Sequence, residues 1–273
     1  MGSERELALN LAGTDAVLRA VISTCLGQYR RCEARMLADA DNEALHQTRV
    51  SLRRLRSALA LFRPLTAPVP ALEQGLRGLS GALGAVRDLD VLLARTPPGP
   101  LHDRLSGARD EAQAHASALL HAAPTRALLI DLSAWIGMHP PLPEAEARDF
   151  AAAQYDRWRR KVKKAGAALA DGDDAARHRL RKRVKKLRHA AELLGGLFSA
   201  SGRRARFMAA LEPLQDALGA LNDLVAAEAV LARIGSSREP GAAALIGHSK
   251  RPALLARAAK AHDRLLAAPR FWR

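Results

Sequence analysis

The chain has 273 residues, and its 43 Lys and Arg residues outnumber 28 Asp and Glu residues, giving a formal net charge of +15. A surplus of this size indicates a polyanionic partner, such as nucleic acid, an anionic membrane surface or a phosphate polymer. Because no apolar run approaches the ~18 residues of a membrane helix, and the first residues lack signal-peptide character, we expect a soluble cytoplasmic protein with no membrane partner.

The composition predicts an all-α fold. Good helix formers dominate, aromatic residues make up 4% of the chain, and no segment keeps a two-residue alternation of apolar and polar positions. The two cysteines, Cys25 and Cys32, lie seven residues apart in one predicted helix, where an ordinary disulfide cannot form. We interpret both as packing residues of a protein from a reducing compartment.

Proline and small polar residues divide the chain into predicted helices. In the first half we expect helices over residues 5–38, 43–63, 70–94 and 101–121, with a short helical extension from Pro124 to Met138 and with Asp41 or Asn42 capping the second helix. The proline-dense segment 139–143 predicts a junction between halves 1–140 and 141–273. In the second half we expect helices over residues 143–170, 174–199, 203–234 and 241–267.

The two halves share sequence. Residues 37–62 align without gaps with residues 169–194, and 11 of the 26 positions are identical. Residues 83–89 then match 218–224, and a weaker match joins 122–126 to 267–270. Three ordered matches at nearly one spacing favour an internal duplication. We therefore expect two pseudo-symmetric four-helix bundles.

Each copy of the repeated segment carries basic residues along one helix face. We call His46, Arg49, Arg53 and Arg56 the first basic stripe, and His178, Arg181, Lys185 and Arg188 the second basic stripe. Both border the predicted buried face, and stretches 44–62 and 175–191 contain no Asp or Glu. Like charges four residues apart repel by a few tenths of a kcal/mol, so we expect an external anion to balance them. Paired by the duplication, the stripes would form the two walls of one basic cavity.

The paired motifs, His46 to Arg56 with Leu83 to Asp90 and His178 to Arg188 with Leu218 to Asp223, resemble the CHAD domain, the conserved-histidine α-helical domain. The resemblance covers nearly the whole chain and implies two four-helix bundles around a basic cavity that binds inorganic polyphosphate, together with association with polyphosphate granules. Because no cluster of metal ligands accompanies His46 or His178, we expect no catalysis, cofactor or metal. The predicted polyphosphate-binding residues are His46, Arg49, Arg53, Arg54, Arg56, His178, Arg181, Lys182, Lys185, Lys186 and Arg188, with Arg160, Lys163 and Lys164 added from the basic run 157–164.

Three other interpretations stay open. The basic faces can be solvated, or can pair with acids such as Asp88, Asp90 and Asp223 on neighbouring helices. A nucleic-acid-binding protein fits the charge, although the basic helices lack the interleaved aromatics of single-strand binders, and weak nucleic-acid binding stays open. A metal-dependent phosphohydrolase would need ligand clusters that do not accompany His46 or His178. The sequence leaves the oligomeric state open.

Overall fold

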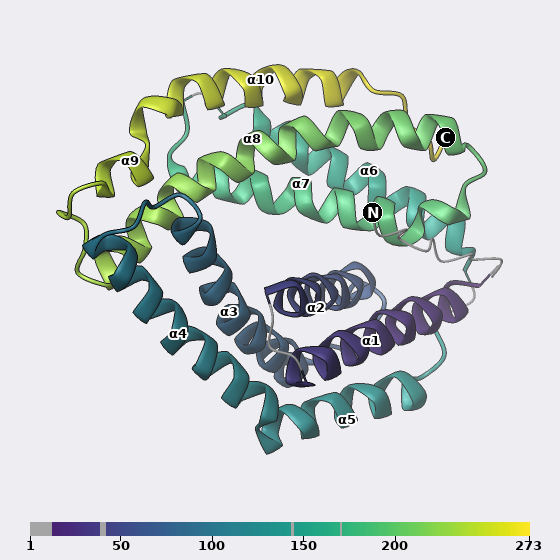
Figure 1. The fold of residues 1–273 in the computed structure, drawn as a ribbon. Helices are drawn as coiled ribbons and strands as arrows, with labels where there is room; N and C mark the ends of the chain where they lie inside the picture. Colours follow the sequence, from purple (N-terminus) through teal and green to yellow (C-terminus); the bar gives the residue numbers. More distant parts are fainter. Residues whose placement is uncertain (1–12, 39–41, 143–144, 170) are drawn as a thin grey trace. The chain divides into compact units, whose positions relative to one another are not determined.

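The computed structural model describes residues 13–38, 42–142, 145–169 and 171–273. Within these ranges the regular elements are helices, which confirms the all-α prediction. They are α1 (Thr14–Ala38), α2 (Asn42–Phe62), α3 (Pro70–Leu93), α4 (Pro100–His121), α5 (Ala123–Met138), α6 (Ala147–Gly166), α7 (Asp174–Leu194), η1 (Gly195–Leu197), α8 (Ser201–Arg233), α9 (Ala242–Ile246), η2 (His248–Lys250) and α10 (Arg251–Ala267) (Figure 1). The predicted helix start at residue 5 and the predicted cap Asp41 lie outside the described residues.

The chain divides into two compact units that are each built from separate stretches. One unit comprises residues 1–21, 142–225 and 248–273, and the other comprises residues 22–141 and 226–247. Helices α1 and α8 therefore contribute to both units. The predicted repeat halves, 1–140 and 141–273, describe a sequence similarity, and the duplication stays a prediction.

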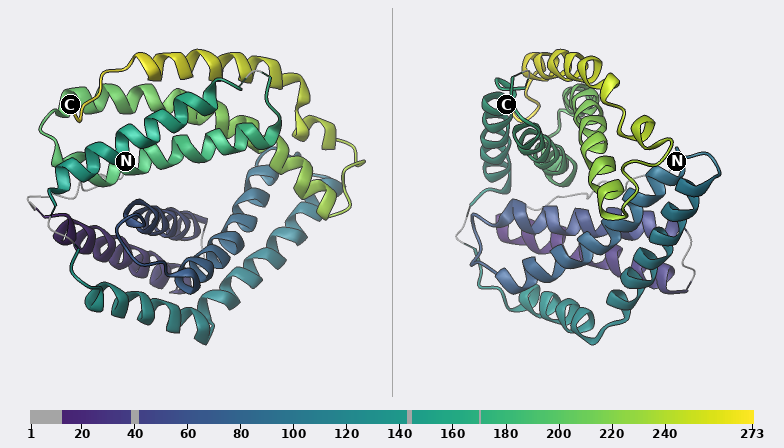
Figure 2. Two further views of the ribbon diagram at one scale, coloured as in Figure 1. Left: turned by 180° about the vertical axis from the view of Figure 1, so that it is seen from behind. Right: turned by 90° about the vertical axis from the view of Figure 1, so that its left-hand side faces the viewer.

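In the unit formed by residues 22–141 and 226–247, α3 packs against α2, α4 and α5 (Figure 2). The last turns of α8 and helix α9 close one end on α3 and α4, through a cluster of buried aliphatic residues: Leu89, Leu92, Leu101, Leu105, Ala227, Val230, Leu231, Ala242 and Leu245. Arg95 fixes this end by donating to the carbonyl oxygen of Leu245 at 3.0 Å. Apolar burial on both sides holds α3 in place, and with it the residues that face α2.

One carboxylate in this unit is buried and fully engaged. Glu33 of α1 is 3% exposed and accepts hydrogen bonds from Arg126 of α5 at 2.6 Å and from the hydroxyl of Tyr29 at 3.0 Å. Burial raises the pKa of Tyr29, and the neighbouring Glu33 raises it further. Since a buried charge is tolerated only when it is paired and hydrogen-bonded, this pair fixes α5 against α1.

The other unit contains α6, α7, most of α8 and α10, and its core includes an aromatic cluster. Tyr155 of α6 contacts Phe198, Phe271 and Trp272 with ring centroids 5.1 to 5.8 Å apart, and Phe207 joins Phe271 and Trp272. Phe271 and Trp272 are 1% and 4% exposed. The segment that follows α10 is therefore anchored in the core of this unit.

The predicted single helix over residues 241–267 is wrong in one respect, because the chain breaks near its start. Gly247 has a φ of 60° and ends α9 in the left-handed conformation, after which η2 and Pro252 in the first turn of α10 restart the helix. Glycine adopts this conformation without the steric cost that other residues meet, and proline is well suited to a first turn. Asp173 caps α7 by accepting from the backbone N–H of Ala176 at 2.7 Å.

Candidate functional site: two basic helices

Helix α2 places the first basic stripe at the edge of its buried face. Leu45, Leu52 and Leu55 are almost completely buried, while all four stripe residues are half-buried. This is the geometry that the helical spacing predicts. A half-buried arginine packs its aliphatic part against apolar surface, so packing holds the stripe.

His46 lies in a cluster of guanidinium groups. Burial lowers the pKa of His46, and Arg49 lowers it further, as do Arg87 of α3 and Arg53; Glu43 acts in the opposite direction. An imidazole surrounded by three arginines resists protonation until an anion enters the cluster. Arg87 was not among the predicted site residues, although it belongs to the second matched motif.

The other two predicted residues of α2 have different surroundings. Arg54 lies against the thiol of Cys25 in α1, where burial raises the pKa of the thiol to about 11 and the guanidinium opposes that rise. Burial lowers the pKa of Arg56, and Arg77 of α3 lowers it further against the effect of Glu73. Arg54 therefore faces α1, whereas Arg56 stays on the α3 side with the rest of the first basic stripe.

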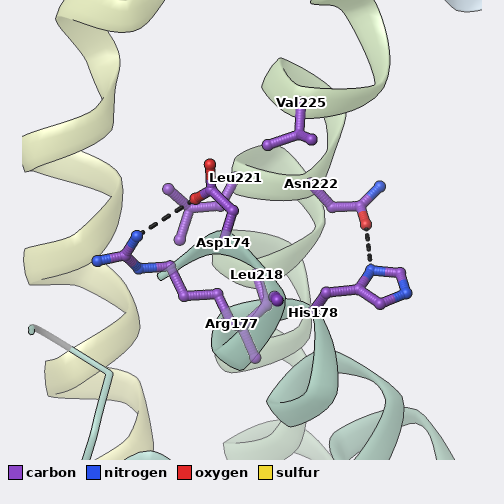
Figure 3. Close-up of a pocket in the computed structure, with 8 residues that line it drawn as sticks. Asp174, Arg177, His178, Leu218, Leu221, Asn222 and Val225 are labelled. Carbon is purple, nitrogen blue, oxygen red and sulfur yellow. Dashed lines mark hydrogen bonds and ion pairs between the residues drawn. The ribbon is translucent and has the colours of Figure 1, made fainter. Parts of the chain in front are cut away.

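Helix α7 carries the second basic stripe, and its histidine contacts α8 beyond the middle of that helix. The Nδ1 of His178 lies 2.9 Å from the Oδ1 of Asn222, a geometry in which Nδ1–H donates and Nε2 stays available (Figure 3). The two residues border a cavity of about 220 Å³, whose other lining residues are Asp174, Ala175, Arg177, Leu218, Leu221 and Val225. Asn222 occupies the position that matches Arg87, so both histidines meet the same motif position.

Both acidic side chains of α7 are engaged in ion pairs. Asp174 forms a bidentate pair with Arg251 of α10, at 2.6 and 3.0 Å, and also accepts from Arg177 at 3.2 Å. The hydrogen bond from Arg251 is the main reason that the pKa of Asp174 is lowered. At the other end of α7, Arg188 donates to Glu192 at 2.7 Å. Glu192 lies just beyond the acid-free stretch and partly neutralises the C-terminal end of the second basic stripe.

The basic run of α6 is split between two faces of that helix. Trp158 lies on the face toward α7, with the Nζ of Lys161 4.5 Å and the Nζ of Lys186 4.8 Å from its ring centroid. Arg160 and Lys163 line a separate cavity with Asp156, Arg159, Arg270 and Arg273. At 100° per residue these positions lie on the side of α6 opposite Trp158. The predicted residues Arg160 and Lys163 are therefore not neighbours of the second basic stripe.

Comparisons with known proteins agree on the family. The family model of the CHAD domain matches residues 20–232. The crystal structure of the CHAD domain from the plant Ricinus communis is 30% identical, covers 98% of this chain and 97% of that chain, and superposes with a TM-score of 0.81. The chain belongs to the CHAD domain family. A second structure, PptA from Streptomyces chartreusis, shares the fold with a TM-score of 0.60 at 21% identity, covering 94% of this chain and 96% of that chain. No curated protein sequence matches the chain.

In this CHAD domain the predicted site residues fall into three groups. The first and second basic stripes are on α2 and α7, with Lys182 exposed beside the second. Arg54 and Lys186, which occupy matching motif positions, both turn toward the preceding helix, α1 or α6. Arg160 and Lys163 belong to the cavity on the far side of α6, and Lys164 is exposed outside its lining.

One acid of the second motif pairs with a residue outside the basic stripes. Asp90 pairs with Arg109 of α4 at 3.2 Å, and its counterpart Val225 cannot form such a pair. This ion pair is therefore confined to one copy of the motif. Over the part of the chain that the structure describes, no helix has the length and apolar character to span a bilayer, and no three His, Cys, Asp or Glu side chains are grouped to hold a metal ion.

Proposed function

We propose that this CHAD domain binds inorganic polyphosphate through the first and second basic stripes. We further propose that it acts by binding, with no catalytic step, and that it associates with polyphosphate granules. Family membership supports the ligand, because the motif resemblance on which the polyphosphate expectation rests is now supported by a family match over residues 20–232. The two stripes are where we expect the phosphates to bind.

The observation that carries the proposal is the charge of α7. The helix holds eight Lys and Arg residues and two acids, a formal charge of +6. Its two acids already form ion pairs with Arg251, Arg177 and Arg188. A helix with this imbalance, half-buried along one side, gains most from a ligand with many closely spaced negative charges.

Polyphosphate suits the residue types on these helices. Each internal phosphate carries about one negative charge and presents oxygens but no bases, so recognition needs donors and few aromatic surfaces. Arginine donates in a bidentate fork and lysine provides a mobile point charge, and both are present in the second basic stripe. The histidines add donors whose strength grows on protonation.

A nucleic acid is the second candidate, and Trp158 favours it. The ring lies beside Lys161, Lys186 and Arg157, whose guanidinium carbon is 5.8 Å from the ring centroid. An aromatic ring framed by cations offers one base a stacking surface. A single such ring gives little affinity for an extended strand, so we rank this candidate below polyphosphate.

The test combines charge reversal with competition. We expect Arg49→Glu with Arg181→Glu to remove most polyphosphate binding while the helical circular dichroism signal is kept. Unlabelled polyphosphate should displace labelled polyphosphate from the native chain far better than single-stranded RNA with the same number of phosphates. Unchanged affinity in the double variant at moderate salt, or stronger competition by RNA, would overturn the proposal.

A further inference from the structure

A second basic site lies where α6 meets the segment that follows α10. The cavity has a volume of about 210 Å³ and is lined by Asp156, Arg159, Arg160, Lys163, Arg270 and Arg273. Five cationic side chains thus surround one carboxylate, which leaves a formal charge of +4 around the cavity. At roughly 30 Å³ for each water, the space holds about seven waters, enough for a short phosphate group.

The carboxylate of Asp156 is already saturated with donors. It accepts from the indole Nε1–H of Trp272 at 3.0 Å, from Arg270 at 3.4 Å and from Arg273. Although burial acts to raise the pKa of Asp156, these donors together lower it. Asp156 therefore organises the C-terminal arginines and offers little to neutralise Arg160 and Lys163.

Arg270 and Arg273 belong to a segment that is anchored before any ligand arrives. Arg270 and Arg273 flank Phe271 and Trp272, whose rings are buried in the aromatic cluster. Figure 1 shows the chain end beside the first turns of α8, and there Arg203 donates to the backbone oxygen of Arg273 at 2.9 Å. Anchoring on both sides lowers the conformational entropy that a ligand must remove from the two arginines.

Arg159 completes the wall of the cavity from α6. It donates through Nη2 to the carbonyl oxygens of Leu266 and, at 3.4 Å, of Ala268, while its Nε is buried without a hydrogen-bond acceptor. Burial lowers the pKa of Arg159, and the neighbouring Arg270 lowers it further. The chain supplies fewer acceptors here than the guanidinium groups have donors.

We propose that this cavity binds a compact multivalent phosphate, such as pyrophosphate or tripolyphosphate, at a site separate from the two basic stripes. The ligand is either a free short phosphate or the end of a longer chain, and both present the same terminal phosphate chemistry to arginine forks. The site does not depend on the proposed function of the stripes, because its α6 residues lie away from the face of α6 that meets α7.

Trp272 provides a local reporter for the test. The chain has three tryptophans, so three indole N–H signals appear in a ¹⁵N spectrum. We expect titration with tripolyphosphate to shift the indole signal of Trp272 more than those of Trp135 and Trp158, with saturation. The variant Arg160→Gln with Lys163→Gln removes two rim contacts from exposed positions. We expect it to weaken tripolyphosphate binding several-fold, because each substitution removes one charge-assisted contact to a phosphate oxygen.

Two control variants separate this site from the stripes. Arg181→Gln with Lys185→Gln should keep the Trp272 response, whether or not long-chain polyphosphate still binds, and Lys260→Gln with Arg264→Gln on α10 should behave as the native chain. Long-chain polyphosphate, at a matched concentration of chain ends, should give the same Trp272 shift if chain ends enter the cavity. It should give no shift if only short phosphates enter. Either result supports the site. No selective Trp272 shift with tripolyphosphate, or loss of the shift in the α7 variant, would overturn it.

Discussion

Neutralising two residues of the second basic stripe gives the sharpest quantitative test of polyphosphate binding. Arg181 and Lys185 are half-buried one helical turn apart on α7, so one extended phosphate chain can contact both. For single-stranded polyanions, each contact contributes about 0.7 to the slope of log K against log salt. Replacing both residues with glutamine should therefore reduce the slope by about 1.4. If the variant and the native chain bind equally at 1 M salt, the variant should bind about 25-fold more weakly at 0.1 M salt, a difference of about 1.9 kcal/mol.

The assay is fluorescence anisotropy of end-labelled polyphosphate at 50, 100 and 200 mM KCl. The matched control is Lys260→Gln with Arg264→Gln, which also removes one lysine and one arginine four residues apart, from exposed positions on α10. We expect the control to keep the native slope within error. Equal slopes for the α7 variant and the control would refute the reasoning, because the loss would then follow net charge and not the stripe.

Three further substitutions in the same unit test an ion pair and the packing around two glycines. Glu192→Gln releases Arg188 from its ion pair and removes a negative charge beside the second basic stripe. Polyphosphate affinity should therefore rise several-fold, with a salt slope larger by about 0.7. Unchanged or weaker binding in the same titration would contradict this. Gly166→Ala places a Cβ against Nε2 of buried His262 and should destabilise the fold by about 1–2 kcal/mol in urea unfolding. Gly219→Ala, with no atom within 4 Å of the new Cβ, should stabilise it by about 0.5–1 kcal/mol. The same sign for both would contradict the packing argument.

The helices could be predicted from the sequence because their signals are local. Proline and glycine stops, together with apolar spacing, place α2, α3 and α4 within a residue or two of their observed ends. The prediction failed at Gly247, since a glycine inside a helical pattern is tolerated or ends the helix according to tertiary contacts that the pattern does not contain. The division of α1 and α8 between two units also depends on tertiary contacts, so the sequence pattern did not predict it.

The stripes could also be predicted, but the partners of individual cations could not. Arg54 and Lys186 directly follow stripe residues in the sequence. A helical wheel places them outside the stripes but does not show which residues they contact. Their contacts with Cys25 and Trp158 depend on which neighbouring helix packs on that side. Glu192 was missed because the acid-free stretch was counted only to residue 191, one position short of the i,i+4 partner of Arg188.

The second motif acquires a physical role in the structure. Its polar position is Arg87 on α3, whose charge lowers the pKa of His46, and Asn222 on α8, which is hydrogen-bonded to His178. Around His46 this adds a third guanidinium, whereas at His178 it adds a neutral hydrogen-bond acceptor that orients the ring. The two histidines should therefore respond differently to an anion and to pH, although their motifs look alike.

That difference yields a pH prediction for His46. Its pKa lies below the ordinary value, because of burial and because Arg49, Arg87 and Arg53 outweigh Glu43. In the free protein the imidazole is therefore neutral at pH 7.5. A bound phosphate screens the three arginines and accepts a hydrogen bond from the ring, which raises the pKa, so binding takes up a proton. Affinity for polyphosphate should then increase as the pH falls from 7.5 to 5.5.

The measurement compares the native chain with His46→Gln, which keeps a hydrogen-bond donor but cannot titrate. Because both proteins meet the same ligand, titration of terminal phosphates and of His178 contributes equally to both. The difference between their affinities should grow toward acid pH, and each tenfold of that difference corresponds to a rise of one unit in the pKa of His46. Calorimetry in two buffers of unlike ionisation enthalpy should show smaller proton uptake for the variant. Parallel pH profiles would mean that no phosphate reaches the cluster of His46, Arg49 and Arg87.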